Sequence, residues 1–281
     1  MSRATALFLT NTKTEDTVIK AAAEAAAVDE THLAVLVHTE TPTLPINAGG
    51  AMPYGGPAPL SDWSNDVAEE NAVLKERCDA INEILARANC SGDPRPFMTA
   101  FADIQDAVAQ AARTADIAFA APNLREDEGV MRAMLHGILF HSPIGVVLNA
   151  GPELRPDHVM IAWDDSPPAA RAVHLALPML KAAKEVTVAC FDPSPLSDGH
   201  PYEPGAALSA WLGHHGCNVT IAQFATGGGE IAAALTSRAK ELGADLIVSG
   251  AYARSRMRQA IFGGTTRSLM EQTDQPVFLA H

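Results

Sequence analysis

Short apolar segments alternate with longer alanine- and leucine-rich segments along the whole chain. Near the start, the apolar residues 4–10 (ATALFLT) precede an alanine-rich stretch at 14–28, and a second apolar run follows at 32–38 (HLAVLVH). Apolar runs of this length are typical of strands buried on both faces of a parallel sheet, and the longer segments have the length of helices that cover it. The pattern therefore predicts an α/β fold.

The alternation begins a second time after a Gly/Pro-rich linker at residues 151–156 (GPELRP). Leu7 and Ile161 are separated by the same number of positions as His32 and Val186, so strand, helix and strand repeat without a gap. The first half is longer because of a Pro/Gly-rich segment at 42–59 and the longer helix expected after it. We expect two tandem domains, at 1–150 and 151–281, each with a five-stranded, Rossmann-like parallel sheet.

The other expected elements follow from the same apolar runs and helix-start signals. In the first half we expect strands at 96–101, 116–121 and 144–148, and helices from 61 or 62 to 87, at 104–113 and at 129–140. In the second half we expect strands at 158–163, 185–191, 218–224, 245–249 and 275–280, and helices after residue 166, at 206–214, 230–242 and 266–272.

The chain is acidic, with 20 Lys and Arg against 33 Asp and Glu, a formal net charge of −13. Such a charge repels phosphate backbones and anionic lipid surfaces, so neither nucleic acid nor a membrane is an expected partner. No apolar run approaches the roughly 20 residues that span a bilayer, and the first residues lack the pattern of a secretory signal. The four cysteines form no CxxC pair, which favours reduced thiols and a cytoplasmic protein.

Three segments, at 162–166, 249–253 and 262–267, are expected to converge and are candidates for ligand contact, because ligands of open α/β sheets bind beyond the carboxyl ends of the strands. In Gly263-Gly264-Thr265-Thr266, consecutive glycines and a helix start can direct backbone N–H groups at a phosphate. The same string is also consistent with a plain helix cap. Asp164 can accept hydrogen bonds from a ribose, or it can cap the helix that follows.

The end of the chain, DLIVSGAYARSRMRQAIFGGTTRSLMEQTDQPVFLAH, resembles the C-terminal signature of the universal stress protein family. Nucleotide-binding members of that family carry Gly, two residues, Gly, nine residues, Gly, and then Ser or Thr. Gly250 and Gly263 stand at the first and third glycine positions, and the upstream VMIAWDDSPPAARAV resembles the family's first strand and its Asp-containing turn. The whole chain resembles the tandem form of the family.

The resemblance implies a fold of the adenine nucleotide alpha hydrolase type that binds ATP or AMP, with Mg²⁺ as a companion of ATP. Transferred by position, Asp164 contacts the ribose and the backbone of Val188 contacts the adenine. Ser249 and Gly250 line the ribose and phosphates. Gly263, Gly264, Thr265 and Thr266 hold the phosphates. Ala253, at the position of the second motif glycine, completes the set of nucleotide-binding residues.

Two positions depart from the family pattern. Ala253 replaces the second glycine, and Gly264 replaces the Ser or Thr, so that Thr265 or Thr266 must supply the hydroxyl. The first half departs further, because Thr10 stands in place of the ribose-binding Asp and residues 125–128 (REDE) are mostly acidic where phosphates bind in the family. We therefore expect the first domain to be a structural partner that does not hold ATP in the family manner.

These features predict a regulatory or binding protein of the stress response, without catalytic residues or a metal site. Two alternatives stay open: an interaction module whose nucleotide site has decayed, and a slow ATPase. The last strand of each half, at 144–148 and 277–280, is expected at a sheet edge, so we predict that the halves pair through these strands as an intramolecular pseudo-dimer. A homodimer of the whole chain also stays open.

Overall fold

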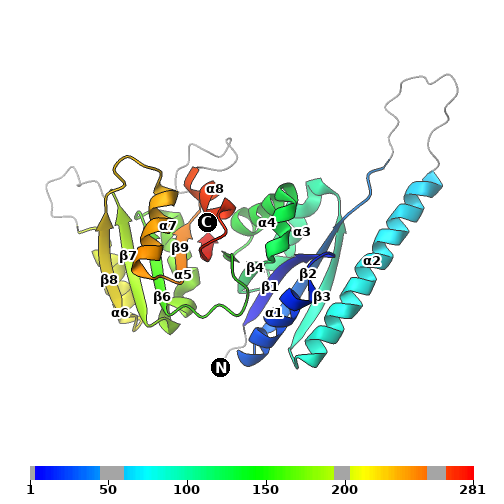
Figure 1. Cartoon of the computed structure of the whole chain (residues 1–281), viewed down its shortest axis with the longest axis horizontal. Helices are drawn as coiled ribbons and strands as arrows, with labels where there is room; N and C mark the ends of the chain where they lie inside the picture. The colour runs from blue at the N-terminus through cyan, green and yellow to red at the C-terminus, as the bar shows by residue number, and fades with distance from the viewer. Residues whose placement is uncertain (1–3, 45–59, 193–202, 252–263) are drawn as a thin grey trace, which may run out of the picture. The chain divides into compact units, whose positions relative to one another are not determined.

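The computed structural model describes residues 4–44, 60–192, 203–251 and 264–281 (Figure 1). The chain divides into two compact units, Met1–Ser142 and Pro143–His281. The assignment of domains to 1–150 and 151–281 stays a prediction about folding units. Within the described residues, no helix has the length and apolar character needed to cross a membrane.

The first unit has four parallel strands in the order β3-β2-β1-β4. Its strands are β1 (Thr5–Asn11), β2 (His32–Glu40), β3 (Gly92–Thr99) and β4 (Ile117–Ala120). Its helices are α1 (Asp16–Val28), α2 (Leu60–Arg87), α3 (Ile104–Ala112) and α4 (Glu128–His141), with short 3₁₀ turns at η1 (Phe101–Asp103) and η2 (Pro122–Glu126).

The alanine-rich composition of α1 explains how it covers the sheet. Its buried residues are Ile19, Ala22, Ala23 and Ala26, a spacing of three or four that defines one helical face. The strands beneath are apolar on both faces, and Leu7, Phe8 and Leu9 of β1 are almost completely buried. Burial on both faces is what the uninterrupted apolar runs of the sequence predict for a parallel sheet.

The second unit has the strand order β5-β10-β9-β6-β7-β8. Its strands are β5 (Val146–Leu148), β6 (His158–Trp163), β7 (Glu185–Phe191), β8 (Val219–Phe224), β9 (Leu246–Gly250) and β10 (Val277–Ala280). Its helices are α5 (Pro167–Ala182), α6 (Ala206–His214), α7 (Ile231–Leu242) and α8 (Gly264–Glu271). All neighbours in this order are parallel except β5 and β10.

The predicted pairing of the two halves' last strands is present, as an antiparallel ladder in which Val147 faces Phe278. The ring of Phe278 lies so close to Gly145 that a Cβ there would be 2.2 Å from its Cζ. Both strands belong to the second unit. The pseudo-dimer of two domains therefore stays a prediction, although the strand contact on which it depends is confirmed.

The expected α/β fold is confirmed, and most elements lie within two residues of their predicted bounds. The bounds predicted for β3 were wrong, because the strand begins at Gly92 and includes Pro94 and Pro96. Helix α8 begins at Gly264, two residues before the predicted start. The segment at 42–59 that was expected to be a loop lies mostly outside the described residues.

Candidate functional site

The carboxyl ends of β6 and β9 lie side by side in the second unit. The two strands are parallel neighbours, and Ala162 of β6 faces Ser249 of β9. Asp164 follows the end of β6, and Gly250 is the last residue of β9. The sequence argument that these segments converge at one edge of the sheet is thus correct for β6 and β9. We call this region the β6–β9 end.

Asp164 is exposed and organises the turn between β6 and α5. Its Oδ1 accepts a hydrogen bond from the backbone N–H of Ser166 at 3.1 Å, and the next residue, Asp165, has a φ of 60°. The cap of α5 is Ser166, whose Oγ accepts from the N–H of Ala169 at 3.3 Å. Because Ser166 caps the helix, the helix-cap alternative for Asp164 is wrong, and its carboxylate is left facing solvent as a hydrogen-bond acceptor.

Gly250 forms the floor of the β6–β9 end, against the first turn of α5. A Cβ at this position would lie 2.5 Å from the backbone N of Ala169 and 2.6 Å from the carbonyl carbon of Pro168. Contacts this short with backbone atoms cannot be relieved by a side-chain rotation. The glycine is therefore required by the close approach of α5 to β9, in addition to any role toward a ligand.

Ser249 and Val188 are both part of the buried sheet. Ser249 is 6% exposed, and its hydroxyl donates to the carbonyl of Gly250 at 3.2 Å. Val188 is fully buried in the middle of β7, where Ile161 pairs with it on one side and Ile221 on the other. The contact of both residues with a nucleotide stays a prediction.

The start of α6 covers the side chain of Val188, a feature that the sequence argument missed. Gly205 precedes this helix with a φ of 80°, and a Cβ on it would lie 2.9 Å from Cγ1 of Val188. The signal in the sequence was the Pro204-Gly205 pair before an apolar helix. Because a left-handed φ and this close contact both favour glycine, the segment is fixed against the sheet.

Helix α8 begins at an exposed residue. Gly264 is exposed, and among the described residues nothing lies within 4 Å of the position that its Cβ would take. Thr265 is half-buried and Thr266 is buried. In a strand–helix–strand connection the helix begins on the side where the preceding strand ends, so this helix start belongs to the same edge as Gly250. Ala253 and Gly263 lie outside the described residues.

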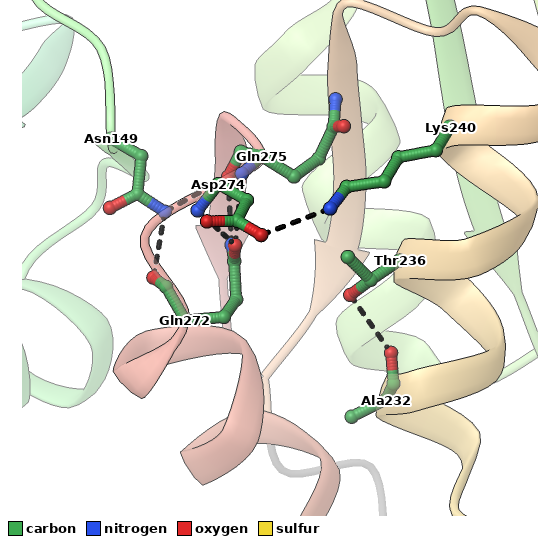
Figure 2. A network of polar contacts seen from close by, with 7 residues as sticks. All are labelled: Asn149, Ala232, Thr236, Lys240, Gln272, Asp274 and Gln275. Carbon is green, nitrogen blue, oxygen red and sulfur yellow. Dashed lines mark hydrogen bonds and ion pairs between the residues drawn. The ribbon is translucent and has the colours of Figure 1, made fainter.

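The other end of α8 is held by a network of side-chain amides (Figure 2). Nδ2 of Asn149 donates to the carbonyls of Gln272 and Gln275, each at 2.9 Å. The Oε1 of Gln272 accepts from the backbone N–H groups of Asp274 and Gln275 at 3.0 and 2.9 Å. The turn between α8 and β10 is therefore fixed by side chains from both sides, and it sets where the helix lies.

Two further contacts extend the network to the neighbouring helix α7. Nζ of Lys240 lies 3.0 Å from Oδ2 of Asp274 (Figure 2). Nε2 of Gln275 donates to the carbonyl of Ala244, two residues after the end of α7, at 2.7 Å. The hydrogen bond and the charge of Lys240 lower the pKa of Asp274. None of these contacts was expected from the sequence, in which glutamines and asparagines carry no spacing signal.

The acidic groups near the β6–β9 end shape its electrostatics. Burial, and then the charge of Asp165, raise the pKa of the Cys190 thiol, so the cysteine is a neutral buried group. Hydrogen bonds from the side chain and backbone of Thr226 lower the pKa of Asp192, just past the end of β7. Within the described residues, no cluster of three or more metal-ligating side chains occurs. Among the described residues, Asp164 and Asp165 are adjacent carboxylates at the end of β6 that a companion Mg²⁺ could use beside the oxygens of its nucleotide.

The corresponding edge of the first unit, the β1–β4 end, is filled by its own side chains. Oδ1 of Asn11 accepts from Nδ2 of Asn123 at 2.8 Å and from the N–H of Lys13 at 3.0 Å. Oγ1 of Thr14 donates to Oδ1 of Asn123 at 3.0 Å. Thr10 is completely buried and donates to the carbonyl of Leu36. These polar groups satisfy one another.

Residues 156–281 match the model of the universal stress protein family. A universal stress protein from Archaeoglobus fulgidus DSM 4304 aligns with a TM-score of 0.65 and 18% identity, over 98% of this chain and 95% of that one. A functionally unknown protein from Pseudomonas aeruginosa PAO1 aligns with a TM-score of 0.51 and 15% identity, over 99% of this chain and 92% of that one.

At these identities the structural likeness establishes the fold over the whole chain. A comparison with curated protein sequences gave no match. The family match covers the half of the chain that contains Asp164, Gly250 and Gly264. Residues 156–281 are therefore a domain of the universal stress protein family.

Proposed function

We propose that the chain is a tandem universal stress protein, a cytoplasmic regulatory protein that binds ATP or AMP at the β6–β9 end of its C-terminal domain. The observation that carries this proposal is the pairing of an exposed acceptor, Asp164, with the tightly closed floor at Gly250. The exposed helix start at Gly264 adds amide donors on the same edge. Together they offer an acceptor for ribose hydroxyls and donors for phosphates.

Binding would act through the stability of the second domain and through its choice of partners. A ligand that binds only the folded state at 100 times its Kd adds about 2.7 kcal/mol to the free energy of unfolding. With ATP, the carboxylates of Asp164 and Asp165 are the available protein ligands for Mg²⁺, which would neutralise phosphate charge. The first domain serves as a structural partner because Asn11, Thr14 and Asn123 occupy its corresponding edge.

Calorimetry of the nucleotide-free chain with ATP and with AMP tests the proposal, using two variants of one residue. Gly264→Asp places a carboxylate at an exposed position that no other described residue crowds, so it should leave the fold intact while it repels phosphate. We expect at least roughly tenfold weaker binding. Gly264→Ala fills the same space without charge and should bind within about threefold of the parent. Absence of heat with both nucleotides would refute nucleotide binding.

A second candidate function is an interaction module without a small ligand. It is favoured by Gly264 itself, because a residue without a hydroxyl stands where the family's nucleotide-binding members have Ser or Thr. Protein that is free of nucleotide after purification and gives no heat with either nucleotide would support this candidate. Release of phosphate above background that is lost in Asp164→Asn would instead favour a slow ATPase.

A further inference from the structure

The edge strands of the two units, β3 and β8, differ in what they offer to another strand. In a parallel pair, alternate residues of each strand direct both N–H and C=O at the neighbour, and the others direct them away. In the first unit, the N–H of Leu33 bonds to the carbonyl of Ser91, and that of Thr41 bonds to Thr99. Odd-numbered residues of β3 therefore bond to β2, and even-numbered residues face outward.

Both prolines of β3, Pro94 and Pro96, stand at outward positions. Proline has no N–H to donate, and its ring obstructs an approaching backbone, so an edge with two outward prolines resists the addition of a strand. The same placement explains why the strand tolerates them, because the ladder with β2 needs no N–H from either residue. The edge of the first unit is thus protected by its sequence.

The edge of the second unit carries no such protection. The N–H of Val186 bonds to the carbonyl of Asn218, and that of Asp192 bonds to Phe224, so even-numbered residues of β8 bond to β7. The outward positions are Val219, Ile221 and Gln223. All three keep their N–H groups, and within the described part of the chain no strand other than β7 pairs with β8. Ile221 is also 41% exposed, although it is a large apolar residue.

We propose that the β8 edge joins two copies of this chain into a dimer, through an antiparallel ladder of β8 with β8. With a twofold axis beside Ile221, the two copies of Ile221 face each other and Val219 of each faces Gln223 of the other. Each of these facing pairs can exchange two N–H···O bonds, so every outward group of the edge finds a partner. Such an isologous arrangement closes on itself and leaves no unpaired β8 edge.

The charge of the chain favours an identical strand as the occupant of this edge. Two copies, each with a formal net charge of −13, repel at long range, so a contact between them is favoured where the facing strands carry no like charges. Residues 218–224 (NVTIAQF) contain no charged residue. An identical strand therefore meets neutral side chains along its whole length, with apolar Ile221 at the centre of the contact.

Sedimentation of the full chain over roughly 1–100 µM tests the proposal. We expect a concentration-dependent dimer. Ile221→Pro places a proline at an outward position of β8, as β3 already has at Pro94 and Pro96. Because it removes one outward N–H from each copy, it should weaken dimerisation at least roughly tenfold. Ile221→Thr keeps the N–H and the β-branched shape and should stay within about threefold of the parent. Circular dichroism checks that both variants fold.

Cysteine cross-linking tests the register independently of stability. In the proposed ladder the Cα atoms of the two Ile221 residues are about 5.5 Å apart, within the range of a disulfide. Ile221→Cys should therefore form a cross-linked dimer under mild oxidation, whereas the control Thr220→Cys, which faces residue 222 of the other copy, should not exceed the parent's background. A monomer at every concentration, a dimer that Ile221→Pro leaves intact, or equal cross-linking at 220 and 221 would overturn the proposal.

Discussion

The β1–β4 end and the β6–β9 end occupy the same place in two versions of one fold, but their side chains do opposite things. At the first, Asn11, Thr14 and Asn123 bond to one another. At the second, one carboxylate oxygen of Asp164 accepts a hydrogen bond from the backbone of its own turn, and the side chain is otherwise exposed to solvent. The difference shows how two parallel sheets can share a topology while the residues at the carboxyl ends of their strands make different polar contacts.

The residue at the end of the fourth strand of each half, Gly250 or Ala121, shows a second difference between the two ends. Gly250 ends β9, and Ala121 follows β4 at the corresponding place, at equal distance from Asp245 and Asp116. Ala121 is buried and fits with its Cβ, whereas a Cβ at Gly250 would collide with the backbone of α5. Close approach of a helix start to the strand end is therefore a property of the second unit.

Replacement of Gly250 by Val should produce the largest effect. Because the obstructing atoms belong to the backbone of Pro168 and Ala169, α5 must move, and we expect the free energy of unfolding of the second unit to fall by about 3 kcal/mol or more. Urea denaturation measures the change. Gly264→Ala is the control, with an expected change below about 0.5 kcal/mol. A Gly250→Val chain as stable as the control would contradict the close contact.

His38 predicts that acid destabilises the first unit. The side chain is 4% exposed, Nε2 has no hydrogen-bond partner among the described residues, and burial lowers the pKa from 6.5 to about 4, against the opposing charge of Asp127. Between pH 6.5 and about 4, His38 is therefore protonated in the unfolded chain but neutral in the folded chain. Stability is fully present above pH 6.5 and falls as the pH decreases toward 4, by about 2–3 kcal/mol in total.

Denaturation midpoints at several pH values between 4 and 7.5 measure this loss. His38→Leu, which cannot be protonated, should remove most of the pH step. His214→Leu, at an exposed position of the second unit, should keep it. The same pH step in His38→Leu and in the parent would assign the acid sensitivity to other groups and remove this difference between the units.

Asn123→Ala tests whether the hydrogen-bonded side chains at the β1–β4 end are all that prevents a nucleotide from binding there. The change removes the amide that bonds to Asn11 and Thr14, and it should cost about 1–2 kcal/mol of unfolding free energy. The acidic residues Glu126, Asp127 and Glu128 remain, so we expect no nucleotide binding to appear at this edge. Asn71→Ala, on the exposed surface of α2, is the control for stability. A second nucleotide site in Asn123→Ala would show that the two ends are more alike than their contacts suggest.

The sequence predicted the topology well because parallel strands are buried on both faces and leave long apolar runs. Those runs located β1, β6 and β7 to within a residue. Strand β3 was misplaced because prolines normally argue against a strand, and only the outward direction of Pro94 and Pro96 makes them compatible with pairing. That direction depends on the register with β2, which a single sequence does not reveal.

Sequence analysis placed Asp164 and Gly250 at strand ends, but it did not predict the contacts that the residues around them make. Motif spacing and strand ends identified Asp164 and Gly250, and the structure brings both to one edge. The close contact of Gly250 with α5 could not be predicted, because it depends on how tightly a helix packs on a strand. The bonds from Asn149 to Gln272 and Gln275 join positions far apart in the sequence, so local pattern could not reveal them either.

Of these substitutions, Asp164→Asn should change stability least. It also tests whether the carboxylate of Asp164 contributes to nucleotide binding at the β6–β9 end. Asparagine keeps an oxygen that can accept from the N–H of Ser166, so the unfolding free energy should change by less than about 0.5 kcal/mol. Hydrogen bonds to a charged acceptor are stronger than those to a neutral one by about 1 kcal/mol, so ATP or AMP should bind roughly fivefold to tenfold more weakly. Calorimetry measures both nucleotides. If Asp164→Asn leaves the affinity unchanged while Gly264→Asp weakens binding, the edge recognises phosphate alone. Asp164 would then only hold its own turn by hydrogen bonding, as Asn11 does in the first unit.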